Sequence, residues 1–495
     1  MSAKRDKSHL LARVNFPLYT VKAVGERHIL VAGGGGMAKT GISNALEIYE
    51  LIYEKSIDAC RAVRVAHFDT GSFICCKCFI LMLFLGNRAI MSSAVFNEDN
   101  NFVLAAGGID GMCIAYKMKY SVNGFDNESR RRSSGSIDIK DGGEGLRRRR
   151  LSSNSSVKDD KENDVNVLNR PLKKNLDSQS RLGDDEYPNI GFVINKMRSI
   201  QSDFNNREGE EPFVKVIRFS NASKMLVTGG ADGHIRCWKY PEFKKILDIA
   251  AHSDEVDDID IHPEGNTILS VSRDGHGYVW NAKTGSKICE LEYVLPISRN
   301  SVKPIKYNFR SIRYGIVEGD SSNLRIFTIL NPVVRQKPPN PSYLCKWNTK
   351  KYIIEKTVSV GPEVLSAMTI SDDGRFLGVG TLSGTIYVYI SYSLQRLYRM
   401  PKAHNIFITG VEFLKSSRET QNLTGDKDAS LISISVDNHI VVHHIPKQGT
   451  IYNLQFDSEF NMQNLILATL GFLGSGLMFT ITLLVVYILL DLLGL

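Results

Sequence analysis

The chain has 495 residues, of which 43% are hydrophobic and 23% charged, and its net charge is +8. This length exceeds that of one small domain, and the composition is that of a globular protein rather than a disordered or collagen-like chain. Of the eight cysteines, Cys75, Cys76 and Cys78 crowd together and the other five are scattered without regular spacing, which argues against a zinc site or a disulfide framework. The positive charge suits an acidic partner or an anionic membrane surface, but it equally suits no particular partner.

The N-terminal residues Met1–Leu11 are polar and basic, and no apolar segment follows them. This pattern predicts that the chain carries no signal peptide.

A glycine-rich segment occupies residues Gly33–Asn44. It is similar to the phosphate-binding template GxxxxGK[ST], but Ala38 replaces the glycine that should precede Lys39. Residues Leu46–Leu51 then indicate a strand, whereas a P-loop opens a helix. A hairpin turn needs one or two glycines, not five within nine positions. The surplus favours a loop that an ion or a partner approaches closely, and the alternative is a long hairpin loop in which the glycines serve only the turn.

Residues Ser72–Asn87 are strongly apolar but too short to span a membrane comfortably. They show neither strand alternation nor a turn signal. We expect an insertion that does not belong to the protein's core, or a segment introduced by an error in the gene prediction.

A repeat determines the predicted fold. Trp238 and Trp280 close two similar hairpin segments and lie 42 positions apart. Each copy is an apolar strand, a tight turn at Asp-Gly or Ser-Gly, and a second alternating strand. The clear copies are Phe102–Tyr116, Met225–Trp238, Thr267–Trp280 and Phe376–Tyr389, and the weaker ones are Ile29–Leu51, Ser311–Ile329 and Leu431–Ile445.

A period of about 40–45 residues with four short strands per unit is typical of the WD-repeat β-propeller. Seven units predict an all-β, seven-bladed propeller within residues 1–460, because no single unit can bury both faces of its sheet. We expect the segment Phe16–Val24 to close the ring as the outer strand of the last blade. A β-sandwich would not explain the period. His252 and His404 lie where WD repeats often carry a structural histidine.

A long polar stretch, residues 118–212, interrupts the repeat. It is rich in serine, arginine and aspartate, so it buries little apolar surface and predicts a mostly disordered insert. Its arginine runs, which begin at Arg130 and Arg147, leave three roles open: binding anionic lipid, carrying phosphorylation, or only being solvated.

The C-terminal segment Leu465–Leu490 contains no charged residue and exceeds the roughly 20 residues that cross a bilayer. It predicts a single transmembrane helix, the alternative being a buried core helix. Because no signal peptide precedes it, we expect residues 1–460 to face the cytosol and residues 491–495 to form a lumenal stub.

The glycine segment, the seven-bladed repeat and the C-terminal anchor together resemble the prolactin regulatory element-binding protein family. Its members are the animal exchange factors of the endoplasmic reticulum for the Sar-type small GTPase. The resemblance covers the whole chain except Ser72–Asn87 and much of the polar insert. It implies a membrane protein of the endoplasmic reticulum that releases GDP from this GTPase and starts the budding of coat protein complex II vesicles.

The resemblance also implies roles for residues of the glycine segment. Ile42 would be the apolar contact with the GTPase, Asn44 a polar organiser, and Gly41 part of the tight backbone path. A potassium ion would be held through backbone oxygens of the same loop. The residues implied in holding it are Gly33, Gly34, Gly35, Gly36, Lys39 and Thr40.

Nucleotide exchange needs no covalent step and no small-molecule substrate, only a higher affinity for the empty GTPase than for its nucleotide-bound form. The sequence contains no Gly-x-Ser-x-Gly elbow and no zinc-ligand spacing. Two alternatives remain: a membrane-tethered WD-repeat scaffold, and a DNA-binding regulator. Nucleic-acid binding has little support, since no helix-turn-helix pattern is present and the basic runs lie in the polar insert.

Overall fold

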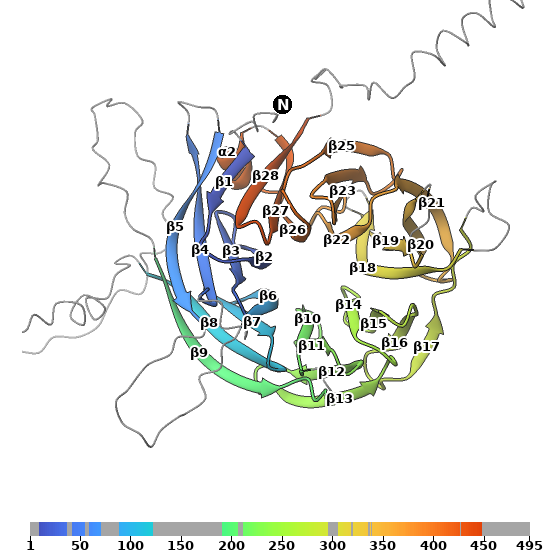
Figure 1. The fold of residues 1–495 in the computed structure, drawn as a ribbon. Helices are drawn as coiled ribbons and strands as arrows, with labels where there is room; N and C mark the ends of the chain where they lie inside the picture. The colour runs from blue at the N-terminus through green and yellow to red at the C-terminus, as the bar shows by residue number, and fades with distance from the viewer. Residues whose placement is uncertain are drawn as a thin grey trace, which may run out of the picture.

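The computed structural model describes residues 9–36, 42–54, 59–70, 89–121, 191–205, 211–295, 305–317, 320–334, 337, 339–425 and 427–447. Its strands form seven four-stranded sheets, all antiparallel, arranged as a ring around a central axis (Figure 1). The predicted seven-bladed β-propeller is therefore confirmed.

In blades 1 to 6 the strands follow one another from the axis outward. Blade 1 comprises β2 (Leu18–Val24), β3 (His28–Gly33), β4 (Ala45–Glu54) and β5 (Ala59–Asp69). Blade 2 comprises β6 (Ile90–Glu98), β7 (Asn101–Gly108), β8 (Met112–Ser121) and β9 (Gly191–Gln201). Blade 3 comprises β10 (Val214–Ser220), β11 (Met225–Gly230), β12 (His234–Lys239) and β13 (Lys244–Ala250). Blade 4 comprises β14 (Val256–Ile261), β15 (Thr267–Ser272), β16 (Gly277–Asn281) and β17 (Lys287–Glu290). Blade 5 comprises β18 (Tyr307–Val317), β19 (Asp320–Pro332), β20 (Ser342–Asn348) and β21 (Ile354–Gly361). Blade 6 comprises β22 (Leu365–Ile370), β23 (Phe376–Thr381), β24 (Ile386–Ile390) and β25 (Arg396–Met400).

Blade 7 contains both ends of the described chain. It comprises β26 (Ile408–Phe413), β27 (Lys427–Ser435), β28 (His439–Pro446) and β1 (Leu10–Arg13), and the short helix α2 (Arg418–Thr424) lies between β26 and β27. In β1, Leu10 pairs with Val441 of β28. The predicted closing strand Phe16–Val24 was wrong, because Leu18–Val24 is the innermost strand of blade 1. A half-exposed strand of four residues has too few apolar positions to show alternation.

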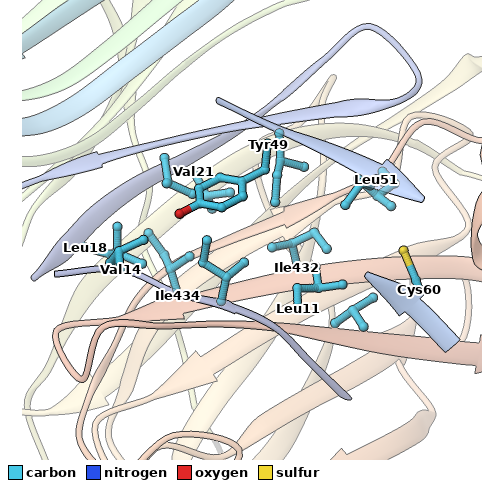
Figure 2. Packing of buried hydrophobic residues seen from close by; sticks show 14 of the residues in the cluster. Leu11, Val14, Leu18, Val21, Tyr49, Leu51, Cys60, Ile432 and Ile434 are labelled. Atoms are coloured by element: carbon cyan, nitrogen blue, oxygen red, sulfur yellow. The ribbon is translucent and has the colours of Figure 1, made fainter. Parts of the chain in front are cut away.

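The buried side chains of the described residues form seven clusters, and each cluster joins two neighbouring blades. At the closure of the ring, Leu11 and Val14 pack among side chains of blades 1 and 7, including Ile432 and Ile434 (Figure 2). Because every blade depends on both neighbours for burial, the ring is stable only when it is complete.

The repeat copies found in the sequence are the second and third strands of their blades, with one exception. Ser311–Ile329 falls on β18 and β19, which are the first and second strands of blade 5. The two strands of this hairpin are the longest first and second strands of any blade, at 11 and 13 residues. Their sequence also contains a Gly-Asp turn signal, so it resembles the hairpin of second and third strands found in the other copies.

The predicted bounds of the polar insert were too wide. β8 continues to Ser121, and Gly191–Gln201 is the outer strand of blade 2. Residues 122–190, the apolar insertion 72–87, and the predicted membrane span and stub at 465–495 lie outside the described residues.

His252 and His404 are structural, as expected. His252 hydrogen-bonds to Asp274 through Nδ1 at 3.0 Å and to Ser270 through Nε2 at 2.8 Å, and Trp280 donates to the same serine at 2.8 Å. Burial acts to raise the pKa of Asp274, but the hydrogen bonds from His252 and from backbone N–H groups lower it to about 2. In blade 7, His404 makes the equivalent bonds to Asp437 and Ser433. These side chains hold their blades together rather than carry out chemistry.

Candidate functional site

Antiparallel strands place the connections of the propeller on two faces. The turns between the second and third strands of each blade, and the segments that link one blade to the next, lie on one face. The first-to-second and third-to-fourth turns lie on the other. The glycine segment joins β3 to β4, the second and third strands of blade 1. We call its side of the ring the glycine-loop face and the other side the opposite face.

The glycine segment is a hairpin loop and not a P-loop. Gly33 at the end of β3 pairs with Ala45 at the start of β4. β4 is a ten-residue strand, so no helix N-terminus is available to receive a phosphate. The prediction of a strand at Leu46–Leu51 is therefore confirmed. Residues 37–41, among them Lys39, Thr40 and Gly41, lie outside the described residues.

The first two glycines are required by packing within the protein. A Cβ atom on Gly33 would lie 1.9 Å from the carbonyl oxygen of Pro17, and one on Gly34 would lie 2.1 Å from Oδ1 of Asn44. Gly34 also has a φ of +142°, which other residues rarely adopt. Part of the glycine surplus is thus explained by the neighbouring Pro17 and Asn44, and not by an approaching partner.

Asn44 ties the two ends of the loop together. Its Oδ1 accepts a hydrogen bond from the N–H of Gly36 at 3.0 Å, and its Nδ2 donates to the carbonyl of Gly36 at 3.4 Å. The side chain is only 4% exposed, so in the free protein it faces the loop and not the solvent. This geometry is that of a residue that orders a loop.

Ile42 lies two residues before Asn44 and is 41% exposed. A large apolar side chain exposed to water is available to a partner surface. The described part of the segment therefore has a buried polar residue, Asn44, and an exposed apolar residue, Ile42, two positions apart.

The loop is also in contact with its neighbours on the glycine-loop face. Gly36 lies against Ile109, in the turn between β7 and β8, because a Cβ on Gly36 would be 3.1 Å from Ile109 Cδ1. On the other side, the N–H of Thr70 donates to the carbonyl of Asn44 at 2.9 Å. The apolar insertion 72–87 therefore begins two residues after a contact with the base of the glycine loop.

The central channel is lined by paired charges rather than by a catalytic group. Asp258 is buried and binds Arg218 and Arg313 from the two neighbouring blades. Burial acts to raise the pKa of Asp258, but the charges of Arg313 and Arg218 hold it below its usual value. Within the part of the chain that the structure describes, no cluster of three His, Cys, Asp or Glu side chains is arranged to bind a metal.

Comparisons with known proteins agree with this geometry. The WD domain, G-beta repeat family matches residues 205–239 and 243–281. The guanine nucleotide-exchange factor SEC12 of Mus musculus is 30% identical over 444 residues, which are 89% of this chain and 91% of the mouse protein. The chain belongs to the Sec12 guanine nucleotide-exchange factor family.

A second member of the Sec12 family, from Rattus norvegicus, shows the same identity over the same length. Among solved structures, the WD40 β-propeller domain of Doa1 is similar to this chain with a TM-score of 0.49, at 11% identity, over 89% of this chain and 97% of that domain. Both Sec12 proteins carry the name of exchange factor, which is a regulator of GTPases rather than an enzyme of covalent chemistry.

Among the helices of the described residues, none has the length and apolar character needed to cross a bilayer.

Proposed function

We propose that this member of the Sec12 family activates a Sar-type small GTPase at the endoplasmic reticulum, and so starts the assembly of coat protein complex II vesicles. The proposal is supported by the family's name as a nucleotide-exchange factor and by the resemblance of its glycine segment and C-terminal anchor. The observation that carries it is the pair of hydrogen bonds between Asn44 and Gly36, which joins the two described ends of the loop two residues from exposed Ile42.

In this proposal the loop acts by differential affinity. Exchange is accelerated when the propeller binds the empty GTPase more tightly than the GDP-bound form. Ile42 gains a cover for its apolar surface only in the complex, and that gain offsets the loss of contacts between GDP and the GTPase. Asn44 keeps the loop in one conformation, so that little ordering entropy is lost on binding.

We further propose that this loop binds a potassium ion. The donor set is oxygen, which suits a hard cation. In our proposal the backbone oxygens of Gly33, Gly34, Gly35 and Gly36 hold the ion together with Lys39 and Thr40. The bound cation would supply positive charge beside the nucleotide site of the GTPase.

The proposed membrane anchor is the segment Leu465–Leu490. β28 runs from the glycine-loop face to the opposite face and ends at Pro446, so the chain leaves the propeller on the side away from the glycine loop. The GTPase would then bind on the face that does not lead to the anchor. Resistance of the full chain to alkaline extraction from microsomes tests the anchor, and complete extraction would refute it.

Release of fluorescent GDP from a Sar-type GTPase tests the exchange activity. The full chain, in liposomes and in potassium buffer, should accelerate release, and Ile42→Ala should reduce that acceleration at least tenfold, which corresponds to about 1.4 kcal/mol. Replacing potassium with lithium should also slow release. Ile353→Ala is the matched control, because Ile353 is an exposed isoleucine on the opposite face. Equal rates with and without the wild-type chain would refute the proposed function and favour a scaffold.

A further inference from the structure

Exposed apolar side chains are concentrated on the glycine-loop face. Among the described residues, the large apolar side chains exposed in connections of this face are Ile42, Phe204, Val294, Val333, Val334, Leu382, Ile406 and Phe407. In the described connections of the opposite face, only Ile353 and Tyr392 are exposed. Exposed apolar groups that gather on one side of a soluble domain mark an interaction surface.

Leu382, Ile406 and Phe407 form a patch that we call the blade 6–7 patch. Leu382 lies in the turn between β23 and β24, and the other two lie in the segment that links β25 to β26. The turn and the segment touch, since a Cβ on Gly384 would lie 3.0 Å from the carbonyl oxygen of Ile406. Leu382 and Phe407 both line the opening of the central channel.

The blade 6–7 patch is connected to the base of the glycine loop by hydrogen bonds and strand pairing. Thr409, two residues after Phe407, donates through its hydroxyl to the carbonyl of Leu18 at 2.7 Å. Leu18 pairs directly with Gly33, the first glycine of the loop. β26, which follows the patch, is thus joined to β2, which pairs with the strand that leads into the glycine loop. A partner that binds at the loop can therefore reach the patch across the first strands of two neighbouring blades.

The chemistry of the patch suits an uncharged apolar partner surface. Leu382 is 42% exposed and Phe407 is 42% exposed. The residues beside them, Ser383 and Asn405, are polar but uncharged. Charged residues of the channel, among them Arg310 and Asp257, line the same pocket, but these two pair with each other at 2.6 Å. Exposed aromatic and aliphatic side chains are typical of the fully buried centre of an interface.

The size of a stable complex requires contacts beyond the glycine loop. A specific protein interface buries about 800 Å² on each partner. The described part of the glycine loop, in which Ile42 is the one exposed large apolar residue, does not supply that area. The footprint must therefore extend onto neighbouring blades. A footprint that extends toward blades 7 and 6 would cover the blade 6–7 patch, with its phenylalanine, leucine and isoleucine.

We propose that the blade 6–7 patch is a second docking point, at which an apolar surface of the same GTPase binds while the glycine loop acts at the nucleotide site. This inference rests on the proposed exchange function. It assigns the two features different effects: the patch contributes binding that is uniform through the exchange cycle, whereas Ile42 contributes only when GDP leaves. Uniform binding changes KM and leaves kcat unaltered.

The test is steady-state nucleotide exchange with the full chain in liposomes, at varied concentrations of GTPase. Phe407→Ala and Leu382→Ser should each raise KM at least fivefold, with kcat within twofold of wild type and an unchanged melting temperature. Ile42→Ala should lower kcat instead. Tyr392→Ala and Ile353→Ser, in connections of the opposite face where both wild-type residues are 55% exposed, are the matched controls and should leave KM unchanged.

Two results separate the inference from the function on which it rests. If the wild-type chain accelerates release and both patch variants keep the wild-type KM, the second docking point is refuted while the exchange function stands. If the wild-type chain does not accelerate release, the exchange function itself is refuted. Ile406→Glu, which places a charge on the patch without removing buried volume, keeps the test decisive should Phe407→Ala unfold, and an unchanged KM for it would overturn the inference.

Discussion

Asn44→Ala should disorder the glycine loop while leaving the propeller folded. The substitution removes both side-chain hydrogen bonds to Gly36. A buried donor or acceptor that loses its partner costs about 1–3 kcal/mol. Since about 1.4 kcal/mol is a factor of ten, the population of the ordered loop should fall by roughly five- to 150-fold. GDP release should slow in proportion, by about five- to 150-fold.

Three measurements check this expectation. Fluorescent GDP release gives the rate, hydrogen exchange of the Gly36 amide gives the order of the loop, and thermal unfolding gives global stability. The melting temperature should change by less than about 3 °C, because the pairing of Gly33 with Ala45 does not involve the Asn44 side chain. Asn44→Asp retains the acceptor for Gly36 N–H and should be less impaired. A wild-type rate in Asn44→Ala would refute the reasoning, and so would early unfolding of the whole protein.

Two further predictions concern stability. The ring nitrogens of His28 have no hydrogen-bond partner, and burial, with the nearby charge of Arg27, lowers its pKa from 6.5 to about 4. The unfolded state therefore binds the proton more tightly than the folded state. The free energy of unfolding should be highest above pH 6.5 and should be about 2 kcal/mol lower at pH 5. Urea unfolding should show this loss in wild type but not in His28→Leu, and equal losses in both would contradict the prediction. Deleting residues 72–87 should leave the free energy of unfolding unchanged, or raise it by up to about 2 kcal/mol because the loop to be closed is shorter. Four residues would then join β5 to β6, and three are enough to join β21 to β22. A large loss of stability in urea unfolding would show that the insertion packs against a blade.

The repeat made the blades predictable, because each clear copy contains a tight turn between two alternating strands. The outer strands were harder to predict. β1 and β9 are half exposed, so their sequences lack the apolar alternation that marks inner strands. β9 also follows a long polar stretch, and its sequence was assigned to that stretch.

The sequence identified the glycine loop but not the reason for each glycine. Contacts of Gly33 with Pro17 and of Gly34 with Asn44 join segments that only the fold brings together. The blade 6–7 patch was missed for the same reason, since its residues come from two separate connections. A signal was nevertheless present in Asn405-Ile-Phe, where two bulky apolar residues occupy a segment between blades.

The closure of the ring by β1 has a consequence for synthesis of the protein. His9 contacts the backbone of Val442, which is 433 positions later in the chain. At about 5–20 residues per second, a ribosome that has made β1 needs roughly 20 to 90 s to make its partner strand. During that time the edge of β1 lacks its native pairing strand and Leu11 lacks its neighbours from blade 7, which exposes the edge to pairing with other chains. The ring can therefore be completed only after β28 has left the ribosome, so closure of the propeller is the last step of folding that synthesis permits.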